Sequence, residues 1–148
     1  MIVERIRAAF QQAGQKNTRP RRLIAECLAE RAASGMDFSI DDLWQALRQH
    51  DPHLGRATLY RSIEILVQEG FLDRIDFADG THRYHVCVGR DHRHLTCIQC
   101  HCFIEVHVDL PLEQFTSIGT QANFTIEGLS FTLFGRCANC RLQENGYA

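Results

Sequence analysis

Apolar residues recur at helical spacing through most of the first 70 residues of this chain. Three segments share this spacing and are expected to be amphipathic helices, namely residues 2–13, 19–33 and 39–49. Gly14 separates the first segment from the second, and Pro20 suits the first turn of the second helix. Ser39, followed by Asp42 three residues later, resembles a capping box that opens the third helix.

A fourth helical segment, RATLYRSIEILVQEG, has one apolar face and one exposed face. The core-facing positions follow helical spacing at Leu59, Ile63, Leu66 and Val67. The opposite face carries Ala57, Tyr60, Arg61 and Glu64. Arginine can bind guanine edges or phosphates, and tyrosine and alanine can pack on thymine methyl groups. This face therefore suits the major groove of DNA.

Two strand-like segments, FLDRIDF and THRYHVCV, follow the fourth helix and flank an Asp-Gly dipeptide at 79–80. Such a dipeptide between alternating segments is the strongest short signal of a β-hairpin. Helices followed by a hairpin predict a winged-helix domain over residues 1–88, although any three-helix bundle can share the pattern.

Composition and charge argue against a membrane or secreted protein and show where positive charge is concentrated. The 148 residues have room for one ordinary domain or two small ones. No apolar run approaches the roughly 20 residues that span a bilayer, and charges interrupt the opening segment, so we expect a cytosolic protein without a signal peptide. The net charge of −2 gives no global attraction to nucleic acid. Positive charge is nevertheless concentrated at Lys16, Arg19, Arg21 and Arg22.

Seven cysteines in a cytosolic protein favour metal or redox chemistry over disulfide bonds. Four of them form two C-x-x-C pairs, Cys97 with Cys100 and Cys137 with Cys140. Each pair can hold one edge of a tetrahedron, which predicts a closed four-thiolate zinc site. A thioredoxin-like redox use of the pairs is the alternative. The sequence has no H-E-x-x-H or comparable motif, so we do not expect a zinc enzyme.

The insert between the two pairs is expected to fold as a strand, a helix and a strand, over residues 103–108, 110–123 and 124–135. A small sheet with one covering helix has too little core to be stable alone. Residues 89–148 are therefore expected to form a small α/β domain that needs both zinc and a partner chain.

The order of these features resembles the ferric uptake regulator family of metal-sensing repressors. Three stretches carry the resemblance, GRATLYRSIEILVQEGF, HRHLTCIQC and FGRCANC, and it covers residues 1–141. It implies an α+β protein that dimerises through its second domain and binds a double-stranded DNA operator when a regulatory metal is bound. We expect Tyr60 and Arg61 to enter the major groove. We expect three further residues to hold phosphates or neighbouring base edges, Arg19, Arg56 and Thr58.

The sensed metal depends on which of two overlapping ligand sets is used. The zinc-uptake branch of the family implies Asp73, Cys87, His92 and His94, with His85 as a reserve ligand. The iron-, manganese- and peroxide-sensing branches imply a set without sulfur, Asp37, His85, His92, His94 and Glu105. Thiolate suits zinc better than iron(II), so Cys87 favours a zinc-sensing repressor of metal-uptake genes. Regulatory iron or manganese is the alternative, and a thiol redox switch is a weaker one.

The register of the hairpin decides which of these side chains converge. With a two-residue turn at 79–80, His85 and Cys87 share a face and Asp73 points to the other. With a three-residue loop at 78–80, all three side chains converge. The sequence leaves both registers open.

The chain departs from the family pattern at several places. His101 and Cys102 follow Cys100, where the family usually has a glycine that eases the tight knuckle. The positions of a further metal site found in many members hold Asp91, Arg93 and Leu129, so that site is not expected. The remaining histidines, His50, His53, His82 and His107, are expected on the surface or in packing.

Overall fold

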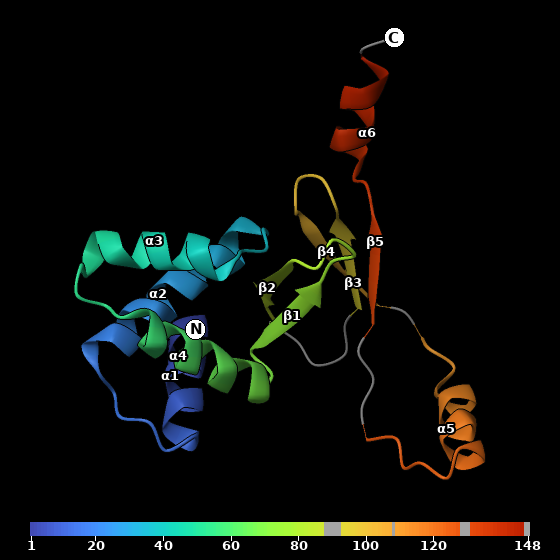
Figure 1. Ribbon diagram of the computed structural model, residues 1–148, viewed down its shortest axis with the longest axis horizontal. Helices are drawn as coiled ribbons and strands as arrows, with labels where there is room; N and C mark the ends of the chain where they lie inside the picture. The colour runs from blue at the N-terminus through green and yellow to red at the C-terminus, as the bar shows by residue number, and fades with distance from the viewer. Residues whose placement is uncertain (88–92, 108, 128–130, 147–148) are drawn as a thin grey trace.

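The computed structural model describes residues 1–87, 93–107, 109–127 and 131–146 (Figure 1). Its first part contains α1 (Ile2–Gln12), α2 (Arg19–Ser34), α3 (Ile40–His50), α4 (Arg56–Gln68), β1 (Leu72–Asp76) and β2 (His82–Val86). Its second part contains β3 (Arg93–Cys97), β4 (Phe103–Val106), α5 (Leu112–Gln121), β5 (Thr132–Gly135) and α6 (Ala138–Asn145). The fold is the expected α+β class, and the predicted domain boundary at residues 88 and 89 touches the stretch outside the described residues.

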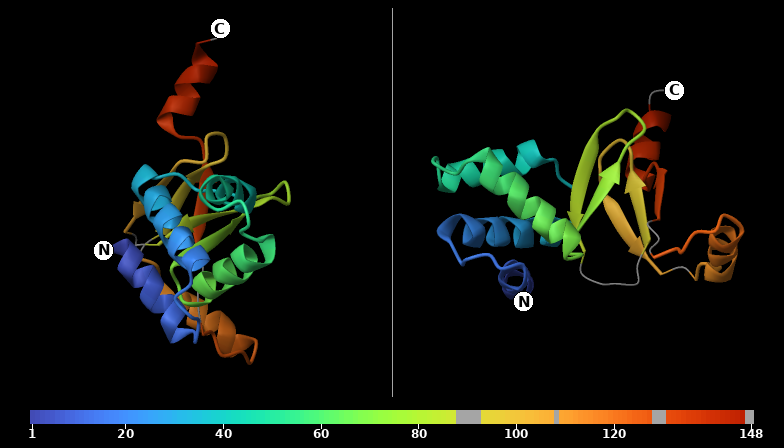
Figure 2. Two further views of the ribbon diagram at one scale, coloured as in Figure 1. Left: turned by 90° about the vertical axis from the view of Figure 1, so that its left-hand side faces the viewer. Right: turned by 60° about the horizontal axis from the view of Figure 1, so that its bottom comes forward.

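Helix α2 lies at the centre of the first part, where it contacts α1, α3, α4 and β2. The core contains side chains from all four helices and the hairpin, among them Ile6, Ile24, Leu28, Leu43, Leu59, Leu66 and Leu72. Cys27 is buried with them, as a small apolar residue would be. The four helices and the β1–β2 hairpin form the predicted winged helix (Figures 1 and 2).

The local signals for the helix ends are confirmed. Pro20 lies in the first turn of α2. The Asp42 backbone N–H donates to Ser39 Oγ at 3.1 Å, and the Ser39 N–H donates to Asp42 Oδ2 at 3.1 Å, which completes the capping box of α3. Gly70, two residues after the end of α4, has a φ of 76° that favours glycine over other residues.

The hairpin has the three-residue loop. The Phe77 N–H donates to the Thr81 carbonyl at 2.8 Å, and Gly80 has a φ of 85° within the loop. In this register Asp73 lies opposite His85, and Leu72 lies opposite Val86. The geometry that brings the side chains of residues 73, 85 and 87 together is therefore the one adopted.

The second part contains a three-stranded sheet in the order β4-β3-β5, with β3 antiparallel to β4 and parallel to β5. The predicted strand over 124–135 was too long, because β5 begins only at Thr132 and residues 124–127 are not in a strand. The Phe124 N–H instead donates to the Gly119 carbonyl at 2.7 Å, which ties this segment to α5. Helix α6 was not predicted.

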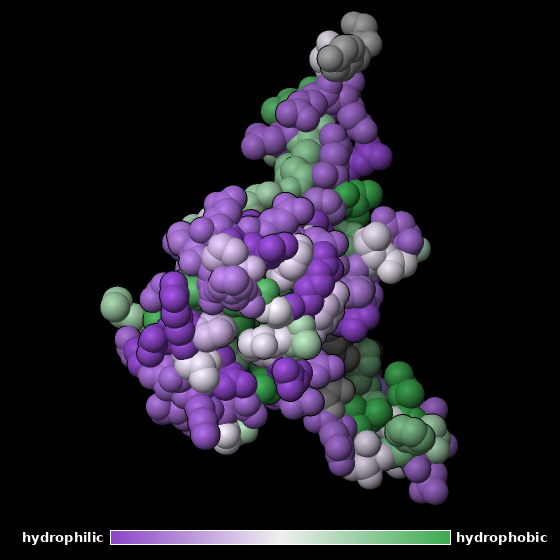
Figure 3. All heavy atoms as spheres, turned by 60° about the vertical axis from the view of Figure 1, so that its left-hand side comes forward, coloured by the Kyte–Doolittle hydropathy of each residue, from purple (hydrophilic) through white to green (hydrophobic). Residues whose placement is uncertain are grey.

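Helices α5 and α6 project away from the rest of the chain (Figures 1 and 2). Apolar side chains on and next to these helices are exposed: Leu112 (58%), Ile118 (58%), Phe124 (73%), Ile126 (47%) and Leu142 (68%). Figure 3 shows apolar atoms gathered on the lower projection, where α5 lies. No helix in the described ranges has the length and apolar character to cross a bilayer.

The loop between α2 and α3 contacts both parts of the chain. Phe38 and Tyr84 exchange backbone hydrogen bonds of 2.8 Å with each other, which joins the loop to the hairpin. Met36 forms a β-bridge with Cys102, and the Phe103 N–H donates to the Gly35 carbonyl at 3.4 Å. Residues 35–38 therefore lie between the hairpin and the start of β4.

Candidate metal centres and DNA-binding face

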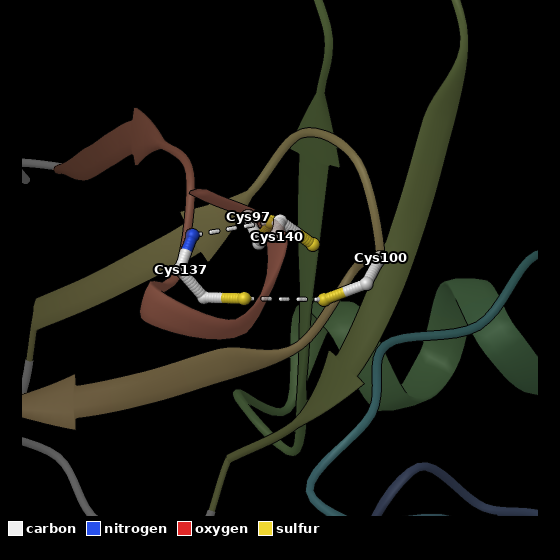
Figure 4. A group of neighbouring side chains, drawn as sticks. All are labelled: Cys97, Cys100, Cys137 and Cys140. Carbon is white, nitrogen blue, oxygen red and sulfur yellow. Dashed lines mark hydrogen bonds between the residues drawn. The ribbon is translucent and has the colours of Figure 1, made fainter. Parts of the chain in front are cut away.

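The four C-x-x-C cysteines come together at the end of the second sheet (Figure 4). Cys97 and Cys100 flank the turn between β3 and β4, and Cys137 and Cys140 lie at the start of α6. The Sγ atoms of Cys97 and Cys140 are 3.7 Å apart, as are those of Cys100 and Cys137. Sulfurs bound to one zinc at about 2.3 Å would be about 3.8 Å apart in a tetrahedron, so the spacing fits a four-thiolate zinc site.

Backbone hydrogen bonds hold the first knuckle. The Cys97 N–H donates to the Cys102 carbonyl at 2.9 Å, and the His101 N–H donates to the Cys97 carbonyl at 3.1 Å. His101 adopts a φ of 63°, the left-handed conformation that glycine adopts most easily. The residue that replaces glycine here thus adopts the left-handed conformation itself, and its ring packs edge-on against Phe77 with centroids 5.5 Å apart.

Cys102 is a fifth thiol beside the four-cysteine group. Burial, followed by the neighbouring thiols of Cys100 and Cys137, raises the pKa of Cys102 to about 12. The metal-ligating group found among the described residues consists of Cys97, Cys100, Cys137 and Cys140, without Cys102.

A second group of metal-ligating side chains lies between the hairpin and the second sheet, and consists of Asp73, His85, Cys87 and His94. One ligand atom from each lies within 4.8 Å of the others. The Nε2 atoms of His85 and His94 are 2.8 Å apart, and Cys87 Sγ is 3.8 Å from His85 Nε2. Asp73 Oδ2 is 3.5 Å from His85 Nε2 and 3.6 Å from His94 Nδ1.

Strand pairing explains why these residues meet. Asp73 on β1 is the register partner of His85 on β2, and Cys87 follows His85 by two positions. His85 is fully buried, and His94 on β3 is 4% exposed. Two imidazoles, one thiol and one carboxylate can bind a metal ion with four ligands, and zinc prefers such a mixed nitrogen and sulfur set.

Burial, together with the adjacent Asp73 carboxylate, raises the pKa of the Cys87 thiol above its ordinary value. A metal ion that binds this thiol as a thiolate must therefore displace a proton. Metal affinity at this group should consequently depend on pH.

Three of the four predicted regulatory ligands, Asp73, Cys87 and His94, are thus brought together, and the reserve ligand His85 joins them. His92 lies outside the described residues.

Of the alternative set of nitrogen and oxygen ligands, His85 and His94 lie in this group, whereas His92 lies outside the described residues. Asp37 is 2% exposed, and its carboxylate accepts a 2.5 Å hydrogen bond from Arg83 Nε. Burial raises the pKa of Asp37, and the hydrogen bond from Arg83 opposes that shift. Neither Asp37 nor Glu105 belongs to the metal-ligating groups found among the described residues.

Four of the five predicted DNA-binding residues are on α4, and the fifth, Arg19, is on α2. Tyr60 is 46% exposed, and Arg61 is exposed while its Nε donates to the Ala57 carbonyl at 3.3 Å. Arg19 is exposed at the start of α2, and Thr58 is half-buried on α4. The predicted recognition face therefore points to solvent and the predicted apolar face to the core.

Arg56 has two neighbours that were not predicted. Its guanidinium lies 4.2 Å from the Trp44 ring centroid and 3.1 Å from an Asp41 carboxylate oxygen. Arg48 also lies over Trp44, at 4.7 Å. The spacing of Trp44 and Arg48, four residues apart on α3, is the signal that predicts their contact.

Comparisons with known proteins agree with this architecture. The profile of the ferric uptake regulator family matches residues 12–134. The ferric uptake regulation protein of Vibrio parahaemolyticus is 30% identical over 137 residues, which cover 93% of this chain and 91% of that protein. The solved Vibrio cholerae ferric uptake regulator is 28% identical, with a TM-score of 0.63, and the match covers 88% of this chain and 98% of that one.

A zinc uptake regulator solved with zinc and DNA has a TM-score of 0.74, and the match covers 97% of this chain and 95% of that one. At 19% identity this likeness concerns the fold alone. The family profile spans most of the chain, including α2 to α4, the hairpin and the first C-x-x-C pair. The chain therefore belongs to the ferric uptake regulator family and is a metal-responsive, DNA-binding transcription regulator, not an enzyme.

Proposed function

We propose that this chain is a zinc-sensing repressor of metal-uptake genes, which binds its operator in the cytoplasm as a homodimer. The observation that carries the choice of zinc is the position of Cys87. This buried thiol lies with two imidazoles and one carboxylate around a common centre. Sulfur and nitrogen ligands favour zinc over iron(II) or manganese(II), which prefer oxygen and nitrogen.

We assign a structural role to zinc at Cys97, Cys100, Cys137 and Cys140. All four ligands come from the ends of the second sheet and the start of α6, so the ion would hold that part of the chain together. We also propose the division into a DNA-binding domain over 1–88 and a dimerisation domain over 89–148. The exposed apolar side chains of α5 and the segment after it support dimerisation, because a second copy can bury them.

The regulatory ion would join the two domains. Asp73, His85 and Cys87 are on or just after the hairpin strands, whereas His94 is on β3 of the second sheet. A bound metal would favour one arrangement of the hairpin relative to the dimerisation domain, and so set the distance between the two α4 helices of the dimer. The gain in DNA affinity is limited by how much more tightly the metal binds that arrangement.

Iron(II) or manganese(II) at the same site is the alternative. The names of several sequence relatives at 28–30% identity, all ferric uptake regulation proteins, favour it. Asp73, His85 and His94 supply nitrogen and oxygen ligands to either ion.

The test is the metal response of DNA binding in Cys87→Ala, with Cys27→Ala as the matched control. Both changes remove a buried thiol, but Cys27 lies in the helical core. Operator binding would be followed by fluorescence anisotropy during separate titrations with zinc, iron(II) and manganese(II). We expect zinc to activate the parent and Cys27→Ala, and Cys87→Ala to remain a dimer with its structural zinc and lose the zinc response.

A Cys87→Ala protein that responds normally to zinc would refute the assignment. So would a parent protein that iron(II) or manganese(II) activates better than zinc.

A further inference from the structure

Three aromatic rings from three strands meet at the second metal-ligating group. The His85 and His94 rings are 3.9 Å apart between centroids at an interplanar angle of 74°. Phe103 of β4 packs on His85 with centroids 4.6 Å apart and an angle of 36°. It also makes a T-shaped contact with His94, with centroids 6.4 Å apart and an angle of 89°. Phe103 therefore contacts the two imidazoles of the group from one side.

Hydrogen bonds hold the backbone of Phe103 at its own N–H and at the residue before it. Phe103 pairs with Thr96 across β4 and β3, and its N–H donates to the Gly35 carbonyl at 3.4 Å. The preceding residue, Cys102, accepts a hydrogen bond of 2.9 Å from the Cys97 N–H. The ring thus projects from a segment that is fixed to the zinc knuckle and to the loop before α3.

We infer that Phe103 is a positioning residue for the regulatory metal, an inference that rests on the proposed function. Its ring limits the rotation of the His85 and His94 imidazoles about their side-chain bonds, so that both present a nitrogen toward Asp73 and Cys87. A smaller side chain leaves space in which the imidazoles rotate, and metal binding must then reorder them.

Residues around a metal site commonly change its affinity by about 10–100-fold through the orientation of the ligands. Phe103 has no polar atom on its side chain, so it acts through packing alone. We therefore expect a change near the lower end of that range when the ring is removed.

The same sheet supplies a matched control. Phe134 on β5 is the register partner of Thr96 on the other side of β3. Its ring meets Phe77 of the hairpin at 5.5 Å, in a T-shaped contact. Phe134→Leu therefore removes an aromatic contact between the same sheet and the same hairpin without touching the imidazoles.

The experiment is a cobalt(II) titration of dimer that carries zinc only at the four-cysteine group. Binding is followed by the thiolate-to-cobalt absorption band that Cys87 would give. Phe103→Leu is expected to keep one structural zinc per chain and bind cobalt about tenfold more weakly than the parent. Phe103→Tyr, which keeps the ring, and Phe134→Leu are expected to bind cobalt as the parent does. Urea unfolding of each variant measures any general loss of stability.

Equal cobalt affinity in Phe103→Leu and the parent, or an equal loss in Phe103→Leu and Phe134→Leu, would overturn the positioning role. The proposed function fails separately, when the parent gives no cobalt band or when Cys87→Ala leaves that band unchanged. In that case the positioning role fails with it, because there is no thiolate-containing site to position.

Discussion

Replacing Gly119 with alanine tests how α5 packs against the segment that follows it. Gly119 is the buried residue of α5. A Cβ atom at this position would lie 2.7 Å from Ile126 Cγ1 and 2.8 Å from the Phe124 carbonyl oxygen. Both distances are shorter than ordinary van der Waals contacts, so at least one neighbour must move.

Two effects of opposite sign then compete. Alanine in place of glycine inside a helix stabilises the protein by about 1 kcal/mol. Overpacking costs about 1–3 kcal/mol when the neighbours cannot move freely. Ile126 is 47% exposed and can change rotamer, but the Phe124 backbone is fixed by its 2.7 Å hydrogen bond to Gly119. We therefore expect the clash to outweigh the helix gain, with a net loss of about 1 kcal/mol.

The assay is urea unfolding of the zinc-loaded dimer at fixed protein concentration, followed by circular dichroism. A lower midpoint with an unchanged slope indicates a loss of stability rather than a change in the unfolded state. Gly135→Ala is the control, because a Cβ there meets no atom within 4 Å, and it should change stability by less than about 0.5 kcal/mol. A Gly119→Ala protein stabilised by about 1 kcal/mol would show that the segment does not pack against α5 in this way.

Three further predictions concern the metals and DNA. Cys97→Ser should give an unstable or monomeric protein, because structural zinc contributes about 10 kcal/mol or more of apparent binding energy. A stable zinc-free dimer, measured by light scattering, would contradict the structural role of the zinc. Arg61→Ala should cost roughly 1–3 kcal/mol in operator binding, measured by anisotropy, while Arg7→Ala on α1 should cost much less. Unchanged operator affinity in Arg61→Ala would show that DNA does not contact this face of α4. Because the pKa of Cys87 is raised, zinc that binds its thiolate must displace a proton at neutral pH. The affinity of the regulatory site for zinc, measured by chelator competition, should therefore rise about tenfold per pH unit between pH 7 and 8. A zinc affinity that does not change with pH would argue against thiolate binding.

The winged helix was predictable from the sequence because its signals are local. Each helix has its apolar stripe, the capping box is contained in four residues, and the hairpin loop is marked by an Asp-Gly pair. Such features depend little on the rest of the chain. The four-cysteine group was equally predictable, because the C-x-x-C spacing alone lets the two thiolates of each pair bind one ion.

The second half was harder to predict for a physical reason. β5 pairs in parallel with β3, from which it is separated by α5 and more than 30 residues, so no local pattern marks where it begins. The apolar residues at 124 and 126 looked like part of a strand, yet they contact α5. The convergence of Asp73 with His85 and Cys87 depended on the hairpin register, which a one-residue change in the loop would alter.

The two metal-ligating groups are expected to have different roles, because their residues come from different parts of the chain. The four cysteines all belong to the second part of the chain, so an ion bound there would act on the folding of that part. In the other group, Asp73 is on the first hairpin strand and His94 is on β3, so an ion bound there would act on the relation between the two parts. The hairpin also follows α4 after only a short turn, in which the Phe71 N–H donates to the Leu66 carbonyl at 2.8 Å and the Cys87 N–H donates to the Phe71 carbonyl at 2.8 Å. A predicted ligand residue is thus hydrogen-bonded to the turn that ends α4. We therefore expect a metal that moves the hairpin to move α4 as well, the helix that we expect to bind DNA.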